Sequence, residues 1–338
     1  MRILLYPFSL LYGAIIRLRN FMYQKEVLKT YRAKIPVISV GNISTGGTGK
    51  TPVSMYLLDY YFNHLQKKVS YLSRGYGRKS HGLLRVEGNE NSQMYGDEAL
   101  MVFNRFPQIP VIVSESRKEG LEVLKNETDI VILDDAFQHR KVDRDLDILV
   151  IDANRLPVGD RILPAGNLRE PLSGIRRADL LIINKVSSPA EIPHIRQRLE
   201  IFQKPMAFCT PQLTQWRFFA EHKNRSIAEL KEKSVCVFSG IGNPQAFEET
   251  LKASRIHILH HQIFRDHHPY KKADFDFFFE AQHSSEKQPF CLLTTEKDYF
   301  RLKNQSWIKE ISNIPLAFVQ MELNWWEGEK LLLEMLPK

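Results

Sequence analysis

The feature that most constrains the fold of this chain is the segment from residue 37 to residue 51, where a β-branched run breaks into glycines and ends in Gly-Lys-Thr. Because glycine tolerates positive φ, successive N–H groups of such a turn can point at one phosphate, and the following helix adds its positive N-terminal end. The pattern predicts a phosphate-binding loop, with Ser44 at the first glycine of G-x-x-x-x-G-K-[ST] as its one departure and an empty structural turn as the alternative. The predicted nucleotide-binding residues are Thr45, Gly46, Gly47, Thr48, Gly49, Lys50, Thr51 and Pro52.

Several positions of this loop have specific expected roles. We expect positive φ at the three glycines, residues 46, 47 and 49. Lys50 is expected to reach the β- and γ-phosphates, and the Thr51 hydroxyl is expected to bind Mg²⁺. Pro52 fits because the first helical positions need no N–H partner.

Composition indicates a folded protein with an anionic partner. The 338 residues are enough for two domains, and 43% hydrophobic with 25% charged residues excludes a disordered chain. The formal net charge of +8 exceeds what a nucleotide requires, so nucleic acid or an anionic membrane are the candidates. Cys209, Cys236 and Cys291 are widely spaced, which favours a reducing compartment and argues against a disulfide or metal role.

The N-terminal segment, residues 1–30, is apolar and then basic. Its apolar part, residues 3–16, spans about 21 Å as a helix, too short for about 30 Å of hydrocarbon. A signal peptide is disfavoured because no A-x-A-like cleavage site follows. We predict an interfacial anchor on an anionic membrane, with a helix packed on the protein core as the alternative. The apolar residues at helical spacing are Phe8, Leu11, Tyr12, Ile15 and Met22.

From residue 35 the chain alternates between short β-branched runs and helical stretches, which predicts a doubly wound, mostly parallel α/β sheet of the P-loop type. The expected strands are 35–41, 69–73, 110–114, 129–134, 146–151 and 178–183, and the expected helices are 50–66, 96–106, 114–125 and 189–202. A linker is expected at 205–232, followed by a smaller α/β unit with strands near 234–239, 256–260, 290–294 and 315–319. The predicted domains are therefore residues 1–30, 31–210 and 211–338.

Ligands bind at the carboxyl ends of the strands in such sheets, so the residues that follow each strand are candidates. Asp134 and Asp135 close an apolar strand in the manner of a Walker B element that binds Mg²⁺, although an acid pair capping a turn has the same pattern. Arg74 and Arg117 follow two other expected strands. The stretch Asn184–Ser187 lacks the final Asp of Asn-Lys-x-Asp, which argues against guanine selectivity.

Further polar residues lie close to these acids in the sequence. Gln138 and His139 follow the acid pair, and a lone histidine there has a structural reading as well. Arg169 and Glu170 are candidates for phosphate and metal, or for a surface ion pair. In the second unit, one of the two adjacent histidines, His267 or His268, is a candidate proton-handling group facing the cleft, with a solvated turn as the alternative.

Taken together, these motifs closely resemble the tetraacyldisaccharide 4'-kinase family of the lipid A pathway of Gram-negative bacteria. Ser44 fits that family. Two positions depart from it: Ala99 stands where the family often has Pro, and Ala136 stands where it usually has Gly. The resemblance covers nearly the whole chain. It is carried by the segments Val40–Pro52, Ser73–Gly77, Gly96–Ala99, Asp134–His139, Leu168–Glu170 and Thr295–Asp298.

The resemblance implies transfer of the ATP γ-phosphoryl to the 4'-hydroxyl of a tetraacyldisaccharide 1-phosphate, which gives lipid IVA. It implies a peripheral or monotopic protein at the cytoplasmic face of the inner membrane. It also implies Asp97 as the base with His267 orienting it, and Lys50 and Arg117 neutralising phosphate charge. The implied Mg²⁺ ligands are Thr51 with Asp134, Asp135 or Glu170, and the implied substrate contacts are Arg74, Gln138, His139 and Arg169.

Two other classes of protein remain as alternatives. A P-loop switch or partitioning ATPase at the membrane shares the loop, but its turnover depends on a protein or DNA partner. A nucleic-acid-binding protein fits only the basic isoelectric point, because the chain lacks a basic-aromatic module and zinc-ligand spacing. We therefore expect a lipid disaccharide and the anionic membrane surface as partners, with neither nucleic acid nor an obligate protein partner.

Overall fold

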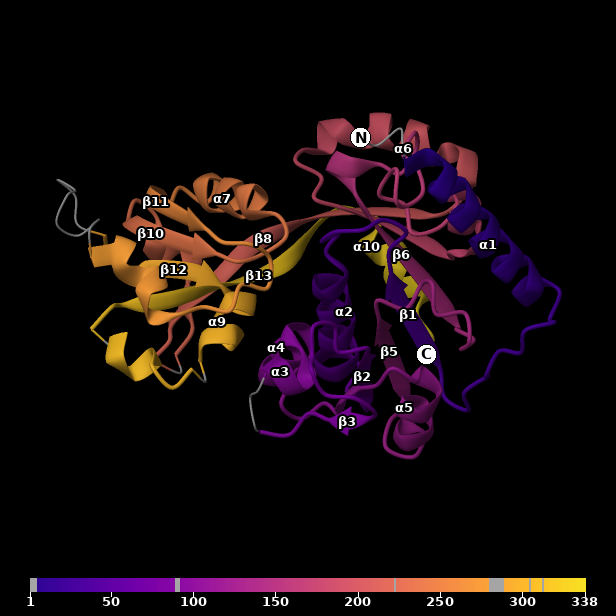
Figure 1. Cartoon of the computed structure of the whole chain (residues 1–338), viewed down its shortest axis with the longest axis horizontal. Helices are drawn as coiled ribbons and strands as arrows, with labels where there is room; N and C mark the ends of the chain where they lie inside the picture. Colours follow the sequence, from indigo (N-terminus) through magenta and orange to yellow (C-terminus); the bar gives the residue numbers. More distant parts are fainter. Residues whose placement is uncertain (1–4, 89–91, 222, 280–288, 304, 312) are drawn as a thin grey trace.

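The computed structural model describes residues 5–88, 92–221, 223–279, 289–303, 305–311 and 313–338. In this part of the chain a 13-stranded sheet runs through two lobes joined by a two-stranded ribbon (Figure 1). Its strand order is β11-β10-β12-β13-β8-β7-β6-β1-β5-β2-β4-β3, with β9 (Arg225–Ser226) paired to β8. The mostly parallel α/β sheet confirms the predicted fold class at that level.

Strand β1 (Val37–Gly41) forms the centre of the first lobe. It lies between β5 (Ile130–Asp134) and β6 (Leu146–Asp152) and is parallel to both. Every residue of these strands is buried, which explains why they are continuous apolar runs in the sequence. The register pairs Val40 with Asp134, so the glycine turn and the first acid leave the sheet beside each other.

The predicted strands and helices of the first lobe are present, with bounds shifted by a few residues. The predicted helix 50–66 is an α-helix that continues as a short π-helix at Tyr60–His64. The remaining strands of this lobe are β2 (Val69–Ser73), β3 (Leu84–Arg85), β4 (Val111–Val113) and β7 (Leu180–Asn184). Its helices are α1 (Tyr6–Gln24), α2 (Lys50–Asp59), α3 (Ser92–Tyr95), α4 (Asp97–Arg105), α5 (Arg117–Leu124), α6 (Ile192–Leu199) and α10 (Glu329–Met335).

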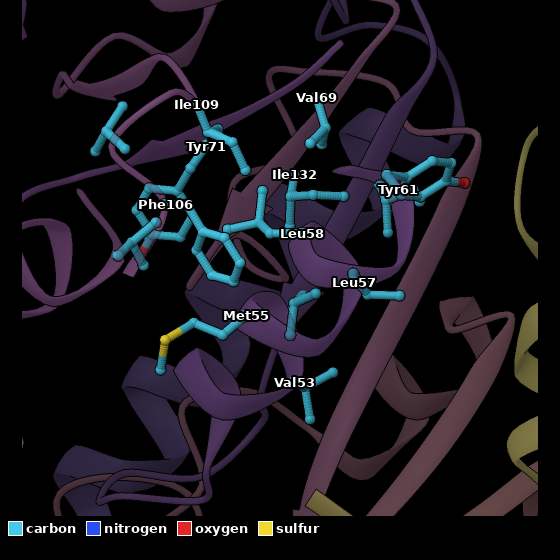
Figure 2. Close-up of a cluster of buried hydrophobic side chains, with 14 of the residues drawn as sticks. Val53, Met55, Leu57, Leu58, Tyr61, Val69, Tyr71, Phe106, Ile109 and Ile132 are labelled. Atoms are coloured by element: carbon cyan, nitrogen blue, oxygen red, sulfur yellow. The ribbon is translucent and has the colours of Figure 1, made fainter. Parts of the chain in front are cut away.

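Helix α2 is held on the sheet by an apolar face. Figure 2 shows Leu57, Leu58 and Tyr61 of this region packed toward Val69 and Ile132 of neighbouring strands. All of these side chains are at most 1% exposed, and full burial of one such side chain contributes about 1.5–3 kcal/mol. The start of α2, which follows the glycine turn, is therefore fixed by the core.

The second lobe is a smaller parallel unit. Strand β10 (Ser234–Ser239) lies between β11 (His257–Ile263) and β12 (Leu292–Thr295), covered by α7 (Pro244–Ala253) and α9 (Glu296–Leu302). These strands agree with the predicted ones near 234–239, 256–260 and 290–294.

The linker expected at 205–232 is wrong as a description of the structure. Strand β8 (Met206–Phe218) fills much of it and pairs antiparallel with β13 (Leu316–Glu327), which runs well beyond the predicted 315–319. Cys209 pairs with Trp325 near the first lobe, and Trp216 pairs with Val319 near the second. The two lobes are therefore connected by paired strands rather than by an irregular segment.

The C-terminal helix α10 returns to the first lobe. Tyr56 donates to Glu329 at 2.6 Å, Tyr61 donates to the Pro337 carbonyl at 2.8 Å, and Leu332 is fully buried. Residues 329–338, which the sequence reading assigned to the second domain, lie against the first lobe. The division at residues 30 and 210 into domains stays a prediction.

Helix α1 has two different faces. One face packs on the first lobe: Ser9 donates to the Ile162 carbonyl at 2.9 Å, and Tyr12 donates to the Arg169 carbonyl at 3.2 Å. The opposite face exposes Phe8, Leu11 and Ile15, each more than half accessible. Among the described residues, no helix is long and apolar enough to cross a membrane. The predicted membrane association stays a prediction.

Candidate active site

The loop between β1 and α2 has the predicted phosphate-binding geometry at two of its three glycines. Gly46 has φ 98° and Gly49 has φ 91°, conformations in which L side chains are strained. A Cβ at Gly49 would lie 1.9 Å from Nδ2 of Asn184. Gly47 does not have a positive φ, so that part of the prediction is wrong.

Residues at the carboxyl ends of β6 and β7 hold this loop in place. Asn184 donates to the Thr48 carbonyl at 2.9 Å, and Lys185 donates from Nζ to the Gly47 carbonyl at 2.6 Å. Lys185 also pairs with Asp152 at 2.6 Å. The sequence reading treated Asn184-Lys185 only as an incomplete guanine motif and missed Asp152. Their position at the carboxyl ends of buried strands was the available signal.

Asp134 and Thr51, two of the predicted Mg²⁺ ligands, lie in contact at the start of α2. The Thr51 hydroxyl donates to Oδ2 of Asp134 at 3.1 Å, and the buried Tyr71 hydroxyl donates to the same oxygen at 2.7 Å. Burial raises the pKa of Asp134, and the opposing effect of the Lys50 charge, which lowers this pKa, is smaller. Hydroxyl and carboxylate oxygens are the ligands that Mg²⁺ prefers, and this ion is usually held by few side chains besides phosphates and water. The described residues contain no group of three or more His, Cys, Asp or Glu placed to hold a metal.

Asp135 holds the loop lysine in place. Its carboxylate lies 3.5 Å from Nζ of Lys50 and accepts two hydrogen bonds from Arg169, at 3.0 and 3.2 Å. Burial works against ionisation, but the charges of Lys50 and Arg169 outweigh it and lower the pKa of Asp135 below its usual value. Lys50 is therefore already desolvated and oriented where an anionic phosphate is expected.

Glu170 lies in a different set of contacts. This fully buried carboxylate pairs with Arg177 at 2.8 and 3.0 Å and accepts hydrogen bonds from Gln138 at 3.0 Å and Asn20 at 3.3 Å. These donors occupy both of its oxygens and link α1 to the first lobe. No contact joins it to Thr51 or Asp134 in the described chain, so its Mg²⁺ role stays a prediction without support from these contacts.

Three of the predicted basic or imidazole side chains lie close to one another, and one of them contacts the first acid of the pair. Arg117 is buried and donates to the carbonyls of Ser114 at 3.0 Å and Asp134 at 3.5 Å, and burial lowers its pKa to about 10. Burial and then the charge of Arg117 lower the pKa of His139 to about 4, so its imidazole is neutral near pH 7. Arg74 is exposed, close enough for its charge to depress both of these pKa values.

Asp97 and His267, which are 170 positions apart in the chain, are brought together across the two lobes. Asp97 is the first residue of α4 and is 5% exposed, and its Oδ2 lies 3.2 Å from Nδ1 of His267. Sequence reasoning missed Arg301 of α9, which donates from Nε to the same oxygen at 2.7 Å. Burial opposes ionisation, yet His267, Arg301 and Lys297 together lower the pKa of Asp97.

Two further ion pairs join α4 of the first lobe to α9 of the second. Glu98 pairs with Lys297 at 3.0 Å, and Arg105 pairs with Glu296 at 2.8 Å. The side of the first lobe that carries Asp97 is thus in direct contact with the second lobe.

Phosphoryl transfer asks little covalent chemistry of a protein, which has to hold phosphates, neutralise charge and align a nucleophile. A braced phosphate loop beside an acid pair, with an ionised carboxylate at the lobe contact, meets these needs. Fold and site together define the class of P-loop phosphotransferases. A family model goes further: residues 1–337 match the model described as LpxK, tetraacyldisaccharide-1-P 4'-kinase, and the chain belongs to that family.

Individual relatives agree with the family model. The tetraacyldisaccharide 4'-kinase of Chlorobium limicola is 37% identical, over 99% of this chain and 97% of that protein. The one of Flavobacterium johnsoniae is 34% identical, over 96% and 95%. The crystal structure of an "apo" form of LpxK from Aquifex aeolicus in complex with ATP is similar with a TM-score of 0.77, at 34% identity and 99% coverage of both chains. The family resemblance inferred from the motifs is confirmed.

Proposed function

We propose that this protein transfers the γ-phosphoryl group of ATP to the 4'-hydroxyl of a tetraacyldisaccharide 1-phosphate, giving lipid IVA in lipid A biosynthesis. The observation that carries the proposal is the family match over residues 1–337, in a chain that has a phosphate-type loop and also a contact between Asp97 and His267 across the two lobes. ATP as co-substrate is supported by the ATP complex of the Aquifex aeolicus relative.

In the reaction, the 4'-oxygen forms a bond to the γ-phosphorus while the bond from that phosphorus to the bridging oxygen of ADP breaks. Asp97 takes the proton of the hydroxyl, and His267 orients its carboxylate. Lys50 and Arg117 offset the negative charge on the transferring group and the leaving phosphate. Arg74, Gln138, His139 and Arg169 are the proposed contacts of the lipid substrate.

Mg²⁺ is the proposed metal, with Thr51 and Asp134 as its first protein ligands and Asp135 close by. Held by these side chains, Mg²⁺ would supply positive charge that offsets the charge of the phosphates. Thr51 and Asp134 already share a hydrogen bond at 3.1 Å, so the site needs little rearrangement to hold a cation.

We place the protein at the cytoplasmic face of the inner membrane, attached through the outer face of α1. A substrate with four acyl chains stays in the bilayer, so its kinase has to work at the membrane surface. Phe8, Leu11 and Ile15 form an exposed apolar face, and Arg17 and Lys25 on the same segment are exposed cations suited to anionic headgroups.

The test is transfer of radiolabelled γ-phosphate from ATP to the tetraacyldisaccharide 1-phosphate in detergent micelles. Label is expected to enter the lipid with the wild type and to fall strongly with Asp97→Asn. An acceptor already phosphorylated at the 4' position is the control and should take up none. ATP hydrolysis that proceeds equally with and without acceptor would contradict the proposal and favour a P-loop switch.

A further inference from the structure

Arg301 occupies a position that no motif in the sequence indicated. Its side chain, 8% exposed, lies between the lobes and contacts groups from three separate segments. It donates from Nε to Asp97 at 2.7 Å and from Nη1 to Asp298 at 2.9 Å, and its Nη2 lies 3.2 Å from Nδ1 of His267. Its Nη1 also donates to the Gly240 carbonyl.

The guanidinium is held rigidly from the second lobe. Asp298, its partner on α9, is fully buried and accepts hydrogen bonds from the hydroxyls of Thr295 at 2.7 Å and Tyr270 at 3.0 Å. The Gly240 carbonyl that accepts from Arg301 also accepts from the backbone N–H of His267 at 3.2 Å. Arg301 and the backbone that carries His267 therefore share one fixed support.

The contacts of Asp97 are unevenly distributed between its two oxygens. Both Arg301 and His267 approach Oδ2, at 2.7 and 3.2 Å. A planar guanidinium donates in fixed directions, so it can orient a carboxylate in a way that a lysine ammonium cannot. Because Oδ2 is held in this way, Oδ1 is the oxygen that is left to accept a proton.

We propose that Arg301 is a positioning residue for phosphoryl transfer: it fixes Oδ2 of Asp97 and the ring of His267 in one arrangement, so that Oδ1 of Asp97 faces the acceptor hydroxyl. This inference rests on the proposed kinase function. Because Arg301 and His267 come from the second lobe and Asp97 from the first, the base is complete only when the lobes are in contact.

The experiment compares Arg301→Gln and Arg301→Lys with the wild type in the lipid kinase assay. Arg105→Gln is the matched control, because it removes another arginine from an ion pair between α4 and α9 without touching Asp97. We expect Arg301→Gln to lower kcat by about 10²-fold or more, with the KM for ATP changed by less than about threefold. Arg301→Lys should recover part of kcat, and Arg105→Gln should stay within about threefold of the wild type.

A pH profile separates positioning from simple structural support. The charged groups that face Asp97 are Arg301 and Lys297 of α9, and the titratable group beside it is His267; Asp266 lies 3.8 Å from Arg301. Arg301 is one of the groups that lower the pKa of Asp97, so Arg301→Gln should move the acidic limb of kcat to higher pH. Arg105→Gln should leave that limb in place.

The positioning role is refuted if Arg301→Gln lowers kcat no more than Arg105→Gln does. It is also refuted if the fold-loss of kcat in the double variant, Arg301→Gln with Asp97→Asn, equals the product of the two single losses. Thermal unfolding of each variant distinguishes loss of the fold from loss of positioning, and Arg301→Lys serves where Arg301→Gln does not fold. Failure of the kinase proposal has a different signature, because then the wild type itself transfers no phosphate to the lipid.

Discussion

At the scale of single residues, the site depends on a few groups that each hold another in place. Lys50 is the clearest case, because the carboxylate of Asp135 lies 3.5 Å from its ammonium and orients it. A cation held in this way meets charge on the transferring phosphoryl without reorganisation during the reaction.

Lys50→Ala is therefore expected to lower kcat by about 10²–10³-fold while the protein stays folded. The control is Lys68→Ala, which should leave turnover unchanged. Lys68 is exposed and lies just before β2, at the end of that strand opposite to its carboxyl end. Steady-state kinetics with the lipid acceptor measure both. Near-normal turnover of a folded Lys50→Ala protein would remove the loop lysine from the mechanism.

Gly49 tests the geometry of the loop through stability instead of activity. An alanine there needs φ near 91° and a Cβ 1.9 Å from Nδ2 of Asn184, so Gly49→Ala should cost about 1–3 kcal/mol. The matched variant is Gly47→Ala, whose Cβ would have no atom within 4 Å and which should change stability by less than about 0.5 kcal/mol. Chemical denaturation compares the two, and equal costs would show that the loop relaxes freely.

The sequence could predict a site residue only where the neighbouring residues in the chain define its role. Lys50 and Asp134 are set by the pattern of one strand and the turn that follows, which sequence shows directly. Arg301 and Tyr71 act through partners far away in the chain, and nothing in their own neighbourhood marks them. The contact of Asp97 with His267 came from the family resemblance, since spacing alone carries no information over 170 positions.

At the scale of elements, the buried parallel strands were predictable and the ribbon was not. β1, β5 and β6 are covered on both faces and are therefore continuous apolar runs. β8 is only partly buried and carries Pro211 and several polar residues, so its sequence has the composition of a linker. Its strand character depends on pairing with β13, about a hundred residues later, which the local sequence does not reveal.

Helix α1 gives the prediction at this scale. Because Ser9, Tyr12 and Asn20 fix its inner face, deleting the helix would disturb the lobe as well as any membrane contact. The sharper change is Leu11→Gln with Ile15→Gln on the outer face, which should lower binding to vesicles that contain anionic phospholipid by about tenfold without changing thermal unfolding.

Two further measurements complete this test of membrane binding by α1. High salt should weaken the binding that remains, because screening removes the attraction of the basic residues. Val123→Gln, at an exposed apolar position on α5 away from this face, is the control. Unchanged flotation of the double variant with vesicles would show that α1 is only a structural helix.

At the scale of the whole molecule, the ribbon of β8 and β13 joins the two lobes (Figure 1). Ion pairs between α4 and α9 add a second contact between the lobes. Placing Asp97 at this contact couples the chemistry to the arrangement of the lobes. In the proposed mechanism, the base is complete only when the lobes meet, which would restrict the access of water and limit hydrolysis of ATP.

The pH dependence of stability tests this coupling. The pKa of Asp97 is lowered in the folded protein by His267, Arg301 and Lys297 despite burial. A carboxyl group with a depressed folded pKa adds stability that is present above its unfolded pKa, about 3.9, and is lost as the pH falls through the folded value. The wild type should therefore exceed Asp97→Asn in unfolding free energy by about 1–3 kcal/mol at pH 7, and the difference should shrink below about pH 4. Denaturant unfolding at a series of pH values measures it, with Asp129→Asn, far from the lobe contact, as the reference variant. A difference that stays constant down to pH 3 would show that the charge of Asp97 contributes nothing to holding the lobes together.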